Sequence, residues 1–113
     1  MEMIDYQDFA KVEMRVGKII QVEAFPEARK PAYKLTIDFG SEIGIKKSSA
    51  QITELYTKEQ LLSRLVACVV NFPVKQVGPF FSECLTCGAP DSQGRVVLIG
   101  FDKTNIPLGS KIF

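Results

Sequence analysis

The sequence predicts an all-β fold in which five or six short strands close into a small barrel with one short helix. Three observations support this prediction: apolar residues alternate at period two in several short segments, prolines and glycines separate these segments, and one helix-capping pattern is present. The 113 residues suffice for one hydrophobic core and contain no repeat or linker. We therefore expect a single domain over residues 1–113.

The first predicted strand is "VEMRVGKIIQVEAF", preceded by a possible turn of helix over residues 5–9. Period-two alternation gives it one apolar face, interrupted by Lys18, where a bend could let the lysine reach water. The residues expected on that face are Val12, Met14, Val16, Ile20, Val22 and Ala24. Two prolines in "FPEARKPAYK" then predict a loop. The next strand, "KLTIDFG", should point Leu35, Ile37 and Phe39 inward.

The one clear helix signal lies in "TKEQLLSRL". The Thr57 side chain can cap the start of the helix, and the Gln60 side chain can accept a hydrogen bond from the Thr57 N–H in return. Leu61, Leu62 and Leu65 supply apolar side chains. A tight turn and a returning strand in "GSEIGIKKSSAQI" precede the helix, and the apolar run "LVACVVNF" follows it as a strand buried on both faces. A helix between the third and fourth strands favours an OB-type barrel, although periodicity alone also allows another small barrel or a sandwich.

The remainder of the chain predicts more short elements. After Pro73 we expect a loop in "PVKQVGPFF", a strand in "SECLTC" and a turn in "GAPDSQG". A strand in "RVVLIGF" and a turn in "NIPLGSKIF" complete the chain.

Composition limits the partners and the compartment. Fourteen basic against thirteen acidic residues leave a net charge of +1, so nucleic-acid binding would need a local patch. Glu2 and Asp5 stand where a signal peptide would carry positive charge, and no run approaches 18 apolar residues. We expect a cytoplasmic protein without membrane insertion, whose three cysteines are free thiols.

The sequence does not favour catalysis or a bound cofactor. Cys84 and Cys87 form a C-x-x-C within a strand pattern rather than at a helix start, and three cysteines without histidine fall short of the usual zinc ligands. A thiol redox role would need a depressed pKa at Cys84. No phosphate-binding loop is recognisable, and Ser82-Glu83 is more typical of a backbone-capping pair than of a catalytic dyad. We predict a binding module that needs no metal, cofactor or ATP.

Two segments combine cations and aromatic residues as OB-type binding surfaces do. The first, "EARKPAYK", offers Arg29, Lys30, Tyr33 and Lys34. The second, "NFPVKQVGPFFSE", offers Asn71, Phe72, Lys75, Phe80, Phe81, Ser82 and Glu83. Because adjacent strand residues face opposite ways, we expect one of Phe80 and Phe81 to pack inward and the other to border the binding pocket.

The segments "FPEARKPAYKLTIDFG", "IGIKKSSAQIT", "VVNFP" and "VGPFFSECL" resemble the CsaA family of small export-related chaperones. That family is a branch of the tRNA-binding OB domains of methionyl- and tyrosyl-tRNA synthetases and EMAP-II-like proteins. The resemblance, from about Phe9 onward, implies an OB-fold five-stranded Greek-key barrel and a homodimer with N- and C-terminal dimerisation extensions. The residues that the extensions would place at the dimer interface are Tyr6, Phe9, Ile106, Pro107, Ile112 and Phe113.

The resemblance also implies a binding site and a function. Matching motif positions fall at Lys34, Ser49, Gln51, Asn71, Phe72, Ser82 and Glu83. The implied function is an ATP-independent chaperone that holds unfolded precursor polypeptides for export, and the alternative is a tRNA-binding module acting alone or with an aminoacyl-tRNA synthetase.

Physical roles follow for these positions as hypotheses. Phe72 with Phe80 or Phe81 would give apolar contact, and Gln51, Asn71 and Ser82 would hydrogen-bond the peptide backbone. Lys34 and Lys75 would attract an acidic group or a phosphate. Relatives commonly carry more cations after the Asn-hydrophobic pair than the "PVKQ" found here, which favours polypeptide over RNA.

Overall fold

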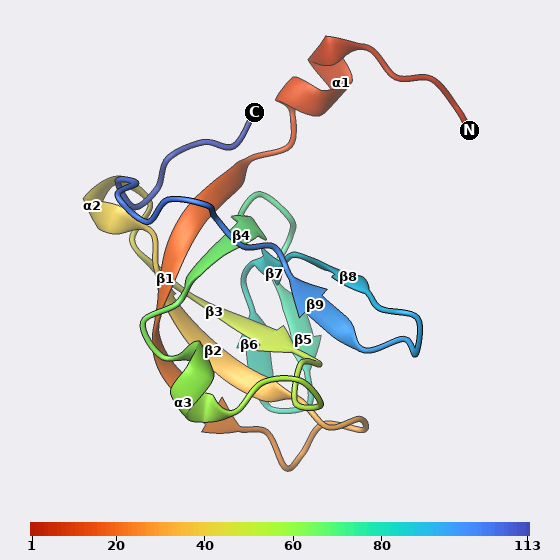
Figure 1. Cartoon of the computed structure of the whole chain (residues 1–113), viewed down its shortest axis with the longest axis vertical. Coiled ribbons are helices and arrows are strands. Elements are labelled where there is room, and N and C mark those ends of the chain that lie inside the picture. Colours follow the sequence, from red (N-terminus) through yellow and green to blue (C-terminus); the bar gives the residue numbers. More distant parts are fainter.

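The computed structural model describes all 113 residues and shows a nearly closed antiparallel barrel (Figure 1). Its five-stranded sheet has the order β3-β2-β1-β4-β7. Ser48 on β3 brings the two ends of this sheet together, because its hydroxyl donates to the Cys84 carbonyl at 3.0 Å and lies 2.9 Å from the Thr86 hydroxyl. The predicted OB-type barrel is confirmed. The strands are β1 (Met14–Ala24), β2 (Tyr33–Asp38), β3 (Ile45–Ala50), β4 (Leu65–Val69) and β7 (Leu85–Thr86).

Three short helices and two small hairpins surround the barrel. The helices are α1 (Tyr6–Ala10), α2 (Gly40–Ile43) and α3 (Lys58–Leu61). The hairpins pair β5 (Lys75–Val77) with β6 (Phe80–Ser82) and β8 (Gly88–Pro90) with β9 (Val96–Leu98). None of the helices is long and apolar enough to cross a membrane.

Helix α3 lies between β3 and β4, as predicted, and begins with the predicted capping box. The Thr57 hydroxyl accepts from the Gln60 N–H at 3.2 Å, and the Gln60 side chain accepts from the Thr57 N–H at 2.9 Å. Leu61 is fully buried, but the helix ends there. Leu62 is therefore exposed, and its predicted place on the apolar face is wrong.

Strand β1 corrects another prediction. Its pairing with β2 shifts register between Ile19 and Gln21, which makes Ile20 the extra residue of a β-bulge. Ile19 is fully buried and Ile20 is exposed, so the prediction that Ile20 points inward is wrong. Val22, beyond the bulge, still packs against the core as predicted. Simple alternation cannot show such a bulge, because it arises in the pairing with the other strand. Lys18 reaches solvent beside this bend, as expected.

The core packs between the strands and α3. Leu35, Ile37 and Phe39 of the second strand segment are buried as predicted, and four of the five β4 residues, 66–69, are buried on both faces of their strand. Four local predictions differ from the structure. The expected loop "PVKQVGPFF" is the β5–β6 hairpin, which turns at Gly78 with a φ of 58°. The expected strand "SECLTC" is reduced to β7, the expected turn "GAPDSQG" begins with β8, and the turn after Phe39 contains α2.

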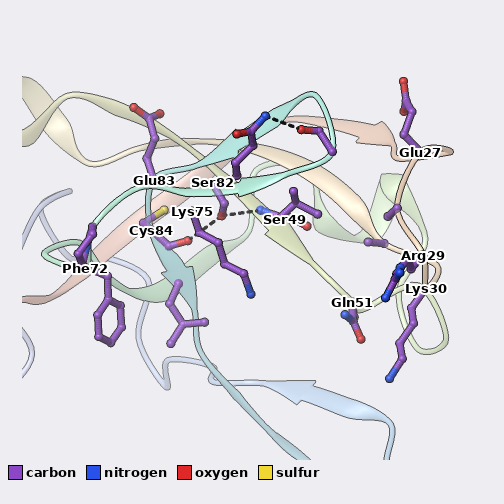
Figure 2. Close-up of a pocket in the computed structure, with 17 residues that line it drawn as sticks. Glu27, Arg29, Lys30, Ser49, Gln51, Phe72, Lys75, Ser82, Glu83 and Cys84 are labelled. Atoms are coloured by element: carbon purple, nitrogen blue, oxygen red, sulfur yellow. Dashed lines mark hydrogen bonds between the residues drawn. The ribbon is translucent and has the colours of Figure 1, made fainter.

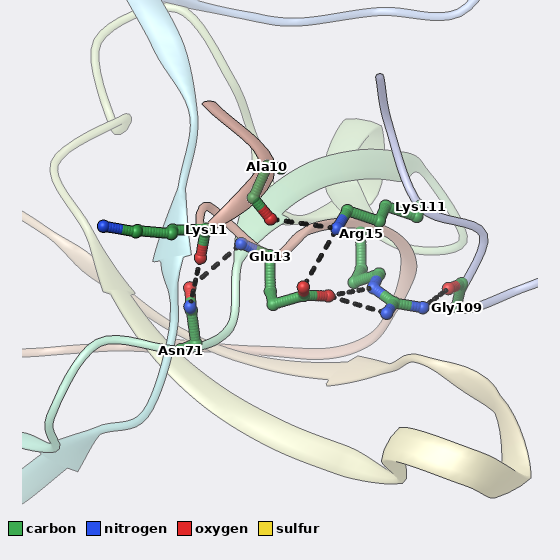
Figure 3. Close-up of polar contacts among 7 residues, drawn as sticks. All are labelled: Ala10, Lys11, Glu13, Arg15, Asn71, Gly109 and Lys111. Carbon is green, nitrogen blue, oxygen red and sulfur yellow. Dashed lines mark hydrogen bonds and ion pairs between the residues drawn. The ribbon is translucent and has the colours of Figure 1, made fainter. Parts of the chain in front are cut away.

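Polar side chains join both ends of the chain to β1 (Figure 3). The Glu13 carboxylate accepts from Arg15 Nη2 at 2.7 Å and from Lys111 Nζ at 3.0 Å. Arg15 Nη1 also donates to the Gly109 carbonyl at 2.9 Å. The hydrogen bonds from Arg15 and Lys111 lower the pKa of Glu13 below its ordinary value. We call Glu13, Arg15, Asn71, Gly109 and Lys111 the terminal network.

Candidate functional site

A groove of about 870 Å³ lies between the loop that follows β1 and the β5–β6 hairpin (Figure 2). Ser49 and Gln51, at the end of β3, lie between these two walls, so three separate parts of the chain form the groove. The residues that line it are Glu27, Ala28, Arg29, Lys30, Ala32, Ser49, Gln51, Phe72, Pro73, Lys75, Gln76, Val77, Gly78, Ser82, Glu83, Cys84 and Leu85.

Charges of both signs line the groove. Arg29 and Lys30 come from the loop after β1, and Lys75 comes from β5. Glu27 and Glu83 place two carboxylates among them. None of these five residues forms an ion pair; the three ion pairs of the structure lie elsewhere. The groove can therefore offer charge to either an acidic or a basic ligand group.

Apolar side chains lie open beside these charges. Phe72 is 55% exposed and Leu85 is 51% exposed, and both line the groove together with Val77. Val74 is also more than half exposed on the segment that leads into β5. Large apolar side chains left in water beside a concave surface are typical of a binding site.

Ser82 and Glu83 line the groove but also close the barrel. The Glu83 N–H donates to the Lys47 carbonyl at 2.7 Å, and the Lys47 N–H donates back to Glu83 Oε1 at 2.9 Å. The Ser49 N–H donates to the Ser82 hydroxyl at 3.1 Å. These side chains cap backbone groups of β3 where the ladder of a regular sheet ends, so the backbone-capping prediction for this pair is confirmed.

Six of the ten predicted binding residues line the groove, and four lie outside it. Asn71 belongs to the terminal network: its amide donates to the Lys11 carbonyl at 2.7 Å and accepts from the Glu13 N–H at 3.0 Å. Lys34 lies over the Phe25 ring, 5.6 Å from the centroid. The six that line the groove are Ser49, Gln51, Phe72, Lys75, Ser82 and Glu83.

Phe80 and Phe81 face opposite ways, as predicted. Phe80 packs edge-on against Phe25, with ring centroids 5.4 Å apart, and Phe81 is 56% exposed. Neither ring lines the groove, so the expectation that one borders it is wrong. The hairpin explains the difference, because it presents Lys75, Gln76 and Val77 of β5 to the groove instead.

Sequence patterns did not identify Glu27, Val77 and Leu85 as groove residues. Glu27 is next to the cations in "EARK", and this position in the same loop could have identified it as a groove residue. Val77 could not be assigned while β5 was expected to be a loop.

The residues predicted for a dimer interface lie near the two ends of the chain, and the C-terminus lies near α1 (Figure 1). Tyr6 and Phe113 are strongly exposed, at 69% and 93%. Pro107 is also exposed. The half-buried members of the set are Phe9, Ile106 and Ile112.

The three cysteines are free thiols placed around β7. The neighbouring Cys84 and burial raise the pKa of Cys68, and burial raises the pKa of Cys87. The hydrogen bond from Cys68 lowers the pKa of Cys84, but this residue is only 6% exposed. A buried thiol cannot readily reach a disulfide substrate, so the geometry does not favour thiol exchange.

Comparison with known proteins shows consistent similarities. The sequence profile of a family described as a putative tRNA binding domain matches residues 14–111. The structure is similar to the CsaA chaperone protein from Picrophilus torridus, with a TM-score of 0.90, 50% identity, and coverage of 98% of this chain and 100% of that one. It is also similar to chaperone CsaA from Bacillus anthracis, with a TM-score of 0.91, 44% identity, and coverage of 99% and 100%.

Similarity extends to a synthetase. Methionine–tRNA ligase from Pyrococcus abyssi is 36% identical over 109 residues, which cover 96% of this chain. The same match covers only 14% of the ligase, so the chain spans a small part of that relative's length.

Proposed function

Because the chain belongs to the family of putative tRNA binding domains and, within it, to the CsaA branch, we propose that it is an ATP-independent chaperone that binds unfolded polypeptides. The observation that carries the proposal is the composition of the groove, where exposed apolar side chains stand beside unpaired charges of both signs. Unfolded chains present this same mixture of apolar and charged groups. The clients we propose are precursor polypeptides held for export in the cytoplasm.

Each part of the groove has a role in this proposal. Phe72 and Leu85 would contact apolar side chains of the client, and their burial on binding would supply much of the affinity. The amide of Gln51 would hydrogen-bond the extended backbone. Arg29 and Glu27, on the same loop, would accept acidic or basic client side chains.

The second candidate function is tRNA binding, alone or beside an aminoacyl-tRNA synthetase. The cations of the groove favour it, because Arg29, Lys30 and Lys75 line one cavity with the exposed ring of Phe72. The carboxylates of Glu27 and Glu83 oppose it, since each would repel a phosphate at the same surface.

A pair of titrations would test the proposal. Fluorescence anisotropy of a permanently unfolded, carboxymethylated polypeptide would measure one affinity, and labelled tRNA would measure the other, each at about 50 and 200 mM salt. We expect polypeptide binding that changes little with salt. Tight tRNA binding with a steep salt dependence, without polypeptide binding, would replace the first function by the second.

We also propose that the protein forms a homodimer through the surface around its two ends. The exposed rings of Tyr6 and Phe113 support this, as do the half-buried side chains of Phe9 and Ile112. Tyr6 and Phe9 pack edge-on in α1, and Lys111 donates to the Ala10 carbonyl at 3.2 Å, which joins the C-terminal segment to this helix. Light scattering of a Tyr6→Ser, Phe113→Ser double variant should show monomers where the unchanged protein shows dimers. Phe81→Ser, an equally apolar change elsewhere, should leave the dimer intact. A wild-type monomer would end this proposal.

A further inference from the structure

A second cavity, of about 600 Å³, shares no lining residue with the groove. It forms where the connection from α3 to β4 meets residues 100–108 of the C-terminal segment, which passes beside β4 on its way from β9 to α2 (Figure 1). Lys18, beside the bulge of β1, also lines it. Ile106, predicted for the dimer interface, also lines it, but polypeptide or tRNA binding in the groove leaves this cavity without a role.

Arg64 is the unusual residue of this cavity. Its Nε is buried and has no hydrogen-bond partner, and its guanidinium forms no ion pair. Arg15 and Arg95, in contrast, each pair with a carboxylate, at 2.7 and 2.9 Å. Arg64 as a whole is half-buried, so a ligand would meet the outer part of its guanidinium, whose charge no carboxylate of the protein balances.

Backbone hydrogen bonds hold the main chain at Arg64, and an aromatic ring positions its guanidinium. The Ile19 N–H donates to the Arg64 carbonyl at 2.9 Å, and the Ser63 N–H donates to the Ile19 carbonyl at 2.8 Å. Ser63 has a φ of 70° and is the one non-glycine residue with a positive φ. The Arg64 guanidinium also lies 5.1 Å from the centroid of the Tyr56 ring. Contacts on both backbone and side chain therefore fix its orientation, as a ligand site requires.

The charge of the cavity is of one sign. Lys18 and Arg64 line it, and no aspartate or glutamate does. The hydroxyls of Ser63 and Thr104 add donors, and Phe101 adds an apolar wall. Two positive charges match the charge of about −2 that a phosphate monoester carries near neutral pH, whereas a carboxylate would balance only one. An arginine fork suits the geometry of phosphate oxygens.

We propose that this cavity binds a phosphate monoester, with the phosphate held by Arg64 and Lys18 and the organic group packed against Phe101. The site is independent of the groove, and its ligand would be the same whether the groove holds a polypeptide or tRNA.

Nuclear magnetic resonance of the full chain tests the proposal directly. In a titration with phenyl phosphate, we expect the side-chain Nε–H signal of Arg64 to shift as the charge of its guanidinium is balanced, and to saturate together with the backbone amides of Ser63 and Thr104. Phenylacetate, which carries a carboxylate in place of the phosphate, should bind at least about fivefold more weakly. Equal or tighter binding of phenylacetate would overturn the assignment to phosphate, and a titration that never saturates at these signals would overturn the site itself.

Variants provide the second test. Arg64→Met should weaken phenyl phosphate binding by about tenfold or more, since it removes the charged guanidinium and keeps an apolar, unbranched side chain. Lys18→Gln should weaken phenyl phosphate binding by about fivefold. If Arg64→Met does not fold, the Lys18 variant alone tests the site. Lys103→Gln removes the same charge from a neighbouring lysine that does not line the cavity, and should have no effect. Unchanged affinity in Lys18→Gln, or an equal loss in Lys103→Gln, would contradict the proposal.

Discussion

The terminal network and the groove use similar side chains in opposite ways. In the terminal network, Glu13 accepts hydrogen bonds from both Arg15 and Lys111, and the Asn71 amide uses both its donor and its acceptor on backbone groups. In the groove, the side chains of Arg29, Lys30 and Lys75 make no ion pair. Polar groups that already have partners join segments of the protein, and polar groups without partners are available to a ligand.

This difference assigns the two regions separate roles: the terminal network stabilises the fold, and the groove binds a ligand. Asn71 stands next to Phe72 in the sequence, yet the first residue holds the N-terminal segment while the second opens into the groove. We therefore expect changes in the terminal network to lower the free energy of unfolding without altering affinity. Changes at the groove residues Phe72 and Lys75, whose side chains have no structural partners, should weaken binding and leave the free energy of unfolding nearly unchanged. The predictions below test that separation.

The largest effect is expected at Gly109. Its φ is 89°, and a Cβ added there would collide with the carbonyl of Phe39. Gly109→Ala should lower the free energy of unfolding, measured in urea, by about 3 kcal/mol. Gly94→Ala is the matched control, because Gly94 has a φ of 79° but open space around it, so only the backbone cost of about 1 kcal/mol is expected. Equal losses would show that the contact with Phe39 does not matter.

In the groove, Phe72→Ala should weaken binding of the carboxymethylated polypeptide by about tenfold or more, because a large exposed ring loses its contact with the client. Phe81→Ala removes an equally exposed ring, 56% against 55%, from outside the groove, and should change affinity by less than about twofold. Urea unfolding of both variants should stay near that of the wild type. Equal loss of affinity in the two variants would move the binding surface away from the groove.

Lys75→Gln distinguishes the two polymers. If the groove binds tRNA, losing one phosphate contact should reduce the slope of log affinity against log salt by about one unit. If it binds polypeptide, anisotropy should show a change of at most a few-fold with little salt dependence. Lys103→Gln is the control, since this lysine lies outside the groove. An unchanged tRNA salt slope in Lys75→Gln would remove Lys75 from any RNA contact.

Local patterns in the sequence predicted much of the fold. Alternation was sufficient for Leu35, Ile37 and Phe39, and the Thr57–Gln60 spacing was sufficient for the start of α3, because each depends on neighbours a few residues away. The bulge at Ile20 was missed because a register shift depends on the partner strand.

The site was harder to predict than the fold, because it too depends on residues that are far apart in the sequence. The groove cations and Phe72 could be found because they cluster in two segments of the sequence. The role of Asn71 could not, since its partners Glu13 and Lys11 lie 58 and 60 residues away along the chain. Short motifs indicate which segments meet a ligand, but pairing across the fold decides which side chains remain free to do so.

The smallest expected effect concerns pH and Glu13. Its folded pKa lies below the ordinary value of 4.5, because Arg15 and Lys111 donate hydrogen bonds to the charged form. A lowered folded pKa means that the stabilisation is fully present above the ordinary value and is lost as pH falls through the folded value. The difference in unfolding free energy between wild type and Glu13→Gln should therefore shrink between about pH 5 and pH 3.

Two controls isolate this effect. The pKa of Asp91 is also lowered, chiefly by the hydrogen bond from the Arg95 backbone N–H, but this effect is present in both proteins and cancels in the difference. Glu59→Gln removes the charge of an exposed glutamate that forms no ion pair and serves as the control for loss of one surface charge. Because Glu13 and Lys111 are partly open to water, salt should reduce the Glu13 effect further. A difference between wild type and Glu13→Gln that stays constant from pH 7 to pH 3 would mean that the terminal network holds through its geometry and not through its charges.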